Sequence, residues 1–242
     1  MKKNKILNTP CFQVENIDTI KEYISHLINL NKGGYSTAIN AEKIMLYSKD
    51  YEMMNIIDNS ILPVPDGSGA VLGLKLLHGL KSIRLDLPKV IFEVSNQKKY
   101  KVFILGASEE VNEKAVKEIK IKYSNIHIVG RRNGYFKNDS EIIQHLRETS
   151  PQIVMVALGS PKQEKFSAAL NIIFPEILFI GCGGALDILA QKITRAPKFF
   201  QDNHLEWLYR LSLEPKRIKR QKILPVYLFK LIIETIKMKL VK

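Results

Sequence analysis

The chain has 242 residues, of which 45% are hydrophobic and 25% charged, and its formal net charge is +13. This composition is that of a globular protein long enough for one sizeable α/β domain, or for a domain with an appendage, and it excludes a disordered chain. The two cysteines, Cys11 and Cys182, form no C-x-x-C pair and have no zinc-ligand spacing, which favours a reducing compartment over a disulfide-stabilised fold. The N-terminal segment is basic but lacks the apolar run of a signal peptide, so we expect a cytoplasmic protein.

The predicted elements alternate between strands and helices along most of the chain. Strands are predicted at residues 34–40, 60–67, 101–106, 126–130, 153–159 and 177–184, and helices at 41–57, 69–80, 109–123, 140–150, 161–170 and 185–191. This alternation is typical of βαβ units, and it predicts an α/β fold with a parallel, Rossmann-like sheet flanked by helices.

The C-terminal part is predicted to be a helical, basic appendage. Residues 216–242 contain nine basic residues and one acidic residue, so they carry +8 of the net charge of +13. A nucleic-acid-binding protein more often spreads its charge over a folded face with interleaved aromatics, and we therefore predict no nucleic-acid partner. The predicted organisation is an α/β domain over residues 1–200 and an appendage over residues 201–242.

The last predicted helix, over residues 226–241, is amphipathic. Its polar residues Lys230, Glu234 and Lys237 form a narrow wedge beside an apolar stripe. Since a spanning helix needs about 20 apolar residues, this one is too short to cross a membrane. The basic excess favours a helix lying on an anionic membrane surface, and the alternative is packing on its own domain or on a second subunit. The stripe comprises Val226, Phe229, Ile232, Ile233, Ile236 and Leu240.

Polar side chains follow five of the predicted strands: Asn40, Asp66, Tyr135, Gln163 and Asp187. Parallel strands end at one edge of a sheet, where α/β proteins bind ligands. Each residue alone could be an ordinary turn residue, and Tyr135 could equally fill the core. Asp66, followed by glycines, could act as a general base on a hydroxyl group.

The turn in "VALGSPKQEKF", residues 156–166, matches neither the dinucleotide-binding nor the P-loop glycine fingerprint. The chain also contains no D-x-D sequence, so it has no obvious carboxylate pair to hold a metal ion on a diphosphate. The segment 205–220, "LEWLYRLSLEPKRIKR", carries three arginines that could meet phosphate charge or form surface ion pairs: Arg210, Arg217 and Arg220.

The order of several motifs resembles the WecG/TagA/CpsF family of bacterial glycosyltransferases, glycosyltransferase family 26. They are "NAEKI", "PDGSGAV", "NGYF", "LGSPKQE", "GCGGALDILA", "RAP" and "LEWLYRLSLEPKRIKRQ", between residues 36 and 221. The resemblance implies transfer of a sugar from a UDP-sugar to a lipid-linked acceptor, with inversion and without a bound metal. It implies a role in teichoic acid, enterobacterial common antigen or exopolysaccharide synthesis.

The resemblance also assigns roles to residues. It implies that Asp66 is the catalytic base, that Asn40 and Gln163 contact the sugar, that Tyr135 and Asp187 hold the uridine, and that Arg210, Arg217 and Arg220 approach the diphosphate. Two positions depart from the family pattern. The family threonine falls at Ala38, with Thr37 one position away on the other face of a regular strand. Arg84 stands at about the family's spacing from the aspartate but lacks the usual R-x-x-G-x-D continuation. Thr37 and Arg84 are candidate substrate-binding residues on this resemblance.

We therefore expect an inverting, metal-independent transferase with a UDP-sugar donor, no further cofactor and a polyprenyl-diphosphate-linked acceptor. An N-acetylmannosamine-type donor is favoured, followed by glucosyl and uronosyl donors. We expect the protein to lie on the inner face of the membrane. The sequence leaves open whether the protein forms a homo-oligomer. The alternatives are a nicotinamide-dependent oxidoreductase, for which the glycine fingerprint is missing, and a non-catalytic module that binds nucleotide-sugars or anionic lipids.

Overall fold

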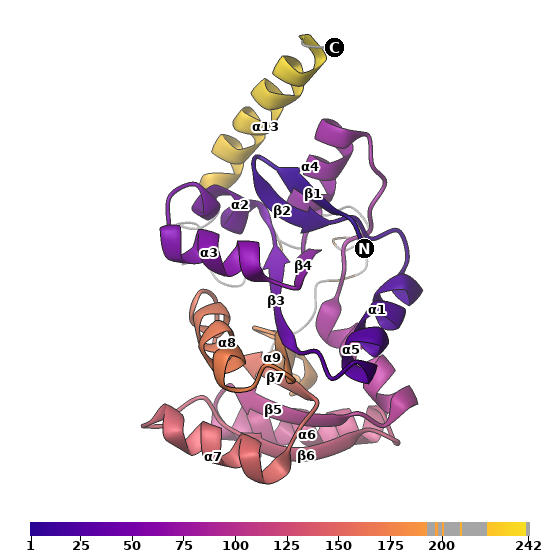
Figure 1. The fold of residues 1–242 in the computed structure, drawn as a ribbon, viewed down its shortest axis with the longest axis vertical. Helices are drawn as coiled ribbons and strands as arrows, with labels where there is room; N and C mark the ends of the chain where they lie inside the picture. Colours follow the sequence, from indigo (N-terminus) through magenta and orange to yellow (C-terminus); the bar gives the residue numbers. More distant parts are fainter. Residues whose placement is uncertain (193–196, 198–199, 201–208, 210–221, 241–242) are drawn as a thin grey trace.

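The structure, a computed structural model, describes residues 1–192, 197, 200, 209 and 222–240. Its centre is a six-stranded sheet in which every neighbouring pair is parallel, in the order β4-β3-β8-β7-β5-β6 (Figure 1). The strands are β3 (Gly34–Ile39), β4 (Leu62–Pro65), β5 (Lys101–Gly106), β6 (His127–Arg132), β7 (Ile153–Ala157) and β8 (Leu178–Gly181). The predicted α/β fold with a parallel sheet is confirmed.

Helices cover both faces of this sheet, which explains why its inner strands are runs of apolar residues rather than alternating patterns. All five residues of β7 are buried, and successive side chains enter two separate cores. The first core lies under α1 (Ile17–Asn29), α5 (Leu87–Lys98), α6 (Glu109–Lys122) and α9 (Ala185–Leu189). The second lies under α2 (Ala41–Tyr47), α3 (Tyr51–Asn59), α4 (Ser68–His78), α7 (Asp139–Thr149) and α8 (Lys162–Ile173).

Several details differ from the sequence prediction, which includes no helix at the positions of α1 and α5. The prediction of a single helix over residues 41–57 is wrong. This segment forms two helices, α2 and α3, because the Asp50 carboxylate accepts a hydrogen bond from the Met53 amide and starts a new helix. The N-terminal residues, for which no element was predicted, form an antiparallel hairpin of β1 (Lys3–Ile6) and β2 (Thr9–Phe12).

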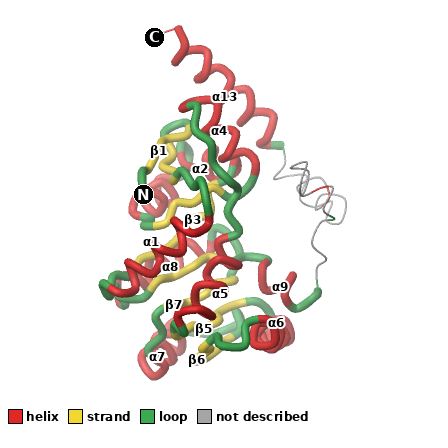
Figure 2. Tube along the Cα trace, turned by 90° about the vertical axis from the view of Figure 1, so that its right-hand side faces the viewer, coloured by secondary structure: helices red, strands yellow, loops and turns green. Residues whose placement is uncertain are grey.

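The C-terminal helix α13 (Ile223–Leu240) docks through one face and leaves the opposite face bare. It packs on α2 and α4 through Tyr227 and Leu231, which are 1% and 0% exposed. The Tyr227 hydroxyl donates a hydrogen bond of 2.7 Å to the Gly69 carbonyl. Figure 2 shows that the rest of α13 extends past the α/β body.

The predicted apolar stripe lies on this bare face, with exposed fractions between 37% for Ile233 and 81% for Leu240. It therefore does not pack on its own domain, although the helix itself does. No helix in the described part of the chain is both long enough and apolar enough to span a membrane. The predicted boundary between residues 200 and 201 lies beside residues outside the described ranges.

Replacing Leu231 by alanine tests this docking. Because Leu231 is completely buried, the substitution leaves a cavity, and we expect the free energy of unfolding to fall by about 2–5 kcal/mol in urea titrations. The neighbouring Ile232, which is 53% exposed, provides the control: Ile232→Ala should change stability by less than about 0.5 kcal/mol. Equal losses in the two variants would show that α13 does not dock through Leu231.

Candidate active site

Asp66 lies in the turn that joins β4 to α4. Its backbone N–H donates to the Ile39 carbonyl at 2.8 Å, which ties this turn to the end of β3. The next residue, Gly67, has φ of +96°, a conformation that favours glycine and lets the chain enter α4 directly after the carboxylate. The Leu85 N–H bonds to the Pro65 carbonyl at 2.9 Å, so Arg84 also lies near the end of β4.

Asn40 directly follows β3, whereas Thr37 lies within that strand. Asn40 is the N-cap of α2, and its side-chain oxygen accepts a hydrogen bond of 3.0 Å from the Lys43 amide. Thr37 is 0% exposed, and its hydroxyl has no hydrogen-bond partner among the described residues. Ala38, at the family threonine position, is half-buried. Asn40 is therefore the better placed of the two polar residues to meet a ligand at the sheet edge.

Gln163 connects the ends of β7 and β8. Its side chain is buried, its Oε1 accepts a hydrogen bond of 3.1 Å from the Gly183 N–H, and its Nε2 donates to Glu164 Oε1 at 3.3 Å. Glu164 in turn forms a buried ion pair of 3.0 Å with Lys43. Sequence reasoning singled out Gln163 but missed Lys43 and Glu164, because their pairing depends on where α2 and α8 lie in space.

Tyr135 follows β6 and is 79% exposed, so of the two alternatives it does not fill the core, and its ring can stack on a planar ligand. Its loop is fixed by Asn133, whose side-chain oxygen accepts from the Tyr135 amide at 2.9 Å and whose Nδ2 donates to Glu109 at 2.6 Å. Hydrogen bonds from Asn133 and Arg131 lower the pKa of the Glu109 carboxyl, which therefore stays ionised at neutral pH. A cavity of about 480 Å³ lies beside Tyr135.

The connections of the sheet reverse direction between β5 and β7, because β5 leads to β6 on one side and β7 leads to β8 on the other. In α/β sheets such a reversal opens a crevice at the carboxyl ends of the strands. Gly159, with φ of +76°, follows β7, while the Gly134 N–H bonds to the Ala107 carbonyl at 2.8 Å and brings the Tyr135 loop to the end of β5. Asp187 lies in α9, just beyond the end of β8.

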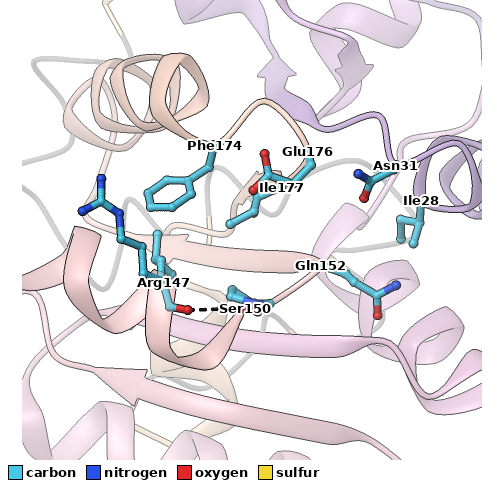
Figure 3. A pocket seen from close by; sticks show the side chains of 10 residues that line it. Ile28, Asn31, Arg147, Ser150, Gln152, Phe174, Glu176 and Ile177 are labelled. Atoms are coloured by element: carbon cyan, nitrogen blue, oxygen red, sulfur yellow. Dashed lines mark hydrogen bonds between the residues drawn. The ribbon is translucent and has the colours of Figure 1, made fainter.

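A second cavity, of about 380 Å³, lies at the opposite edge of the sheet (Figure 3). Its lining includes Gln152 and Ile177, which precede β7 and β8, and Arg147 from α7. None of the predicted site residues lines this cavity, so the cavity is separate from the site at the carboxyl ends of the strands.

The predicted residues thus divide into three groups. Asn40, Asp66, Gln163 and Asp187 lie at or just beyond the ends of neighbouring strands, with Tyr135 at the end of the outermost strand β6. Thr37 lies inside the sheet, and Arg84 lies beside β4. Arg210, Arg217 and Arg220 fall outside the described residues.

Cys182 also lies at this edge, directly before Gly183, but burial raises the pKa of its thiol to about 12 and likewise raises that of Cys11. A protonated, buried thiol is a poor nucleophile. We expect neither cysteine to react with iodoacetamide at neutral pH in the native protein and both to react in denaturant, as counted by intact mass. Rapid labelling of the native protein would contradict this burial.

Comparison with known proteins agrees with the geometry. The model of the "Glycosyl transferase WecG/TagA/CpsF family" matches residues 4–240. The chain belongs to this family. It is therefore a glycosyltransferase of the WecG/TagA/CpsF type, as the motifs at the strand ends predicted.

Two curated relatives carry the same name, N-acetylglucosaminyldiphosphoundecaprenol N-acetyl-beta-D-mannosaminyltransferase. The protein of Bacillus subtilis (strain 168) is 32% identical over 231 residues, covering 94% of this chain and 90% of the relative. That of Bacillus spizizenii (strain ATCC 23059 / NRRL B-14472 / W23) is 31% identical over 226 residues, covering 90% and 88%. The similarity therefore extends over nearly the whole of both proteins.

Proposed function

We propose that this glycosyltransferase transfers an N-acetylmannosamine-type sugar from a UDP-sugar to N-acetylglucosamine linked through diphosphate to a polyprenol. The observation that carries the proposal is a carboxylate, Asp66, at the strand-end edge of a chain that matches this family over residues 4–240. The relatives' shared name supports both the sugar and the lipid-linked acceptor.

In this proposal Asp66 acts as the general base. It takes the proton from the acceptor hydroxyl, whose oxygen attacks the anomeric carbon as the bond from that carbon to UDP breaks. Attack on the face opposite the leaving UDP inverts the configuration. Asn40 and Gln163 hold the sugar, while Tyr135 and Asp187 hold the uridine at the crevice between β5, β7 and β8.

The charge on the departing diphosphate has to be balanced without an evident carboxylate pair for a metal, since the sequence lacks D-x-D. Arginines fixed around the leaving group can supply this stabilisation, and we assign that role to Arg210, Arg217 and Arg220. Arg84, which lies near the end of β4, is a further candidate.

Metal removal tests this assignment. We expect EDTA to leave the turnover rate of the purified protein unchanged within error, because no step requires a divalent cation. Removal of Arg217 should, in contrast, lower the rate while the thermal unfolding transition stays in place. Loss of activity in EDTA that returns with Mg²⁺ or Mn²⁺ would contradict the arginine-based account.

The bare face of α13 supports a peripheral site on the inner membrane face. Six apolar side chains there are accompanied by the exposed lysines Lys230, Lys237 and Lys239, which suit an anionic leaflet. The hydrogen bond from Tyr227 attaches α13 to Gly69, a residue at the start of α4 that follows Asp66 by three positions in the sequence. A polyprenyl-linked acceptor would then meet the site at the surface in which its lipid is embedded.

The donor is tested with a panel of UDP-sugars, measuring UDP release in the presence of a lipid-linked N-acetylglucosamine acceptor. We expect acceptor-dependent release to be fastest with UDP-N-acetylmannosamine. Faster release with a glucosyl or uronosyl donor would replace the sugar but keep the reaction. UDP binding without release from any donor would instead indicate a non-catalytic nucleotide-sugar-binding module.

A further inference from the structure

The Lys43–Glu164 ion pair is the most deeply buried ion pair of the described residues. Its side chains are 7% and 2% exposed, whereas those of the pair Lys165–Glu52, which joins the next residue of α8 to α3, are 40% and 59% exposed. Taking two charges out of water is costly, and such a pair often stabilises a fold no better than apolar residues of similar size. Stability alone therefore gives a weak reason for its presence.

The contacts of Glu164 suggest a different role. Its Oε1 accepts hydrogen bonds from both Lys43 Nζ at 3.0 Å and Gln163 Nε2 at 3.3 Å, while its Oε2 is buried without a partner among the described residues. The carboxylate thus fixes which way the Gln163 amide points. The amide oxygen then faces the Gly183 N–H, at 3.1 Å.

Two glycines adapt the end of β8 to this amide. A Cβ on Gly181 would lie 2.7 Å from Gln163 Nε2, so the amide occupies space that only glycine leaves open. Gly183 has φ of +46°, the left-handed conformation that presents its N–H to Gln163. The Lys43 backbone N–H is itself bonded to Asn40. One connected set of bonds therefore joins the ends of β3, β7 and β8.

We infer that Lys43 and Glu164 are positioning residues, which hold the Gln163 amide and the 181–184 turn in the geometry needed for the sugar donor. The inference rests on the proposed function, because it assigns the donor to this edge of the sheet. Positioning of this kind has large effects, since a displacement of about 1 Å can cost roughly 10²-fold in rate.

The test separates positioning from stability by removing both charges together. In Lys43→Met/Glu164→Leu no charge is left buried alone, so we expect the folded protein to unfold at a similar temperature. Gln163 loses its acceptor, however, and hydrogen exchange in a peptide covering the 181–184 turn should become about tenfold or more faster. The kcat/KM for the donor should fall by roughly tenfold to a hundredfold.

A second comparison asks whether the effect passes through Gln163. In a Gln163→Ala background the same double substitution should cause no further loss in kcat/KM and no faster hydrogen exchange in the 181–184 turn. The effects of residues that act through one another are not additive. The matched control, Lys165→Met/Glu52→Leu, removes the exposed pair between α8 and α3 and should leave exchange in the turn and kcat/KM unchanged.

Unchanged exchange and unchanged kcat/KM in the folded double variant would overturn the inference and leave the pair a packing element. If the double variant does not fold, Glu164→Gln keeps the shape but weakens the acceptor, and it should speed exchange in the turn by a smaller factor; no change there would also overturn the inference. Exchange is measured without substrate. If the wild-type protein transfers no sugar, the proposed function fails, while the exchange comparison still decides whether Glu164 holds the turn.

Discussion

Asp66→Asn is expected to lower the rate of sugar transfer by roughly 10²–10⁴-fold, the usual contribution of a general base. The amide has nearly the same shape as the carboxylate but cannot take the proton from the acceptor hydroxyl. Because Asp66 lies in the turn held by the Ile39 carbonyl, the substitution should leave the fold and the UDP affinity intact. Initial rates with saturating donor and acceptor, together with calorimetric UDP binding, measure the two effects separately.

Asp18→Asn is a suitable control for this prediction, since Asp18 is an exposed carboxylate in the first turn of α1. It should keep the wild-type rate. A loss of less than about tenfold in Asp66→Asn, only ~1.4 kcal/mol in barrier height, would mean that another group removes the proton.

The second large effect is expected on membrane binding. Substituting serine for Phe229, Ile232 and Ile236 removes three exposed apolar side chains from the stripe, each 52% or more exposed. At about 1 kcal/mol or more for each side chain that enters the interface, binding to anionic liposomes should weaken by over a hundredfold. Sedimentation with liposomes of increasing anionic lipid content measures the partition coefficient.

Substitution is a better test than removing the tail. Truncation after Arg220 should also release the protein from liposomes, but it would expose the core surface that Tyr227 and Leu231 cover. A control replaces three apolar residues elsewhere that are still more exposed, Tyr51, Ile121 and Ile172, with serine and should keep binding unchanged. If the stripe variant binds liposomes as the wild-type protein does, or the wild type never binds, the membrane assignment fails. Concentration-dependent association of the wild type that the stripe variant loses would point instead to a second copy of the chain.

Much of the fold was predictable because the sheet strands are short apolar runs bounded by turn residues. A strand that is buried on both faces has apolar side chains at nearly every position, and this pattern is visible in the sequence. The N-terminal hairpin was missed because "KNKI" and "TPCF" neither alternate clearly nor contain an N-G or D-G turn. Helix α5 was missed although its signals were present: Asp86 caps it, and a proline stands in its first turn.

The residues of the site likewise divide into those that the local sequence predicts and those that it does not. Asn40, Asp66, Gln163 and Asp187 could be expected at one edge, because parallel strands align their carboxyl ends and each residue follows a strand. Tyr135 could not be assigned from sequence, since an aromatic residue beside a turn suits both core and surface, and only its 79% exposure decides. The Lys43–Glu164 pair depends on α2 and α8 meeting in space, which no local pattern reveals.

The most direct test of the proposed reaction is the identity of its product. The purified protein is incubated with UDP-N-acetylmannosamine and a lipid-linked N-acetylglucosamine acceptor, and the lipid fraction is analysed by mass spectrometry and NMR. We expect an acceptor that is heavier by one N-acetylhexosamine, joined through an inverted anomeric carbon, with one UDP released per product. An unmodified acceptor with every UDP-sugar tried, or a product with retained configuration, would contradict the proposed reaction.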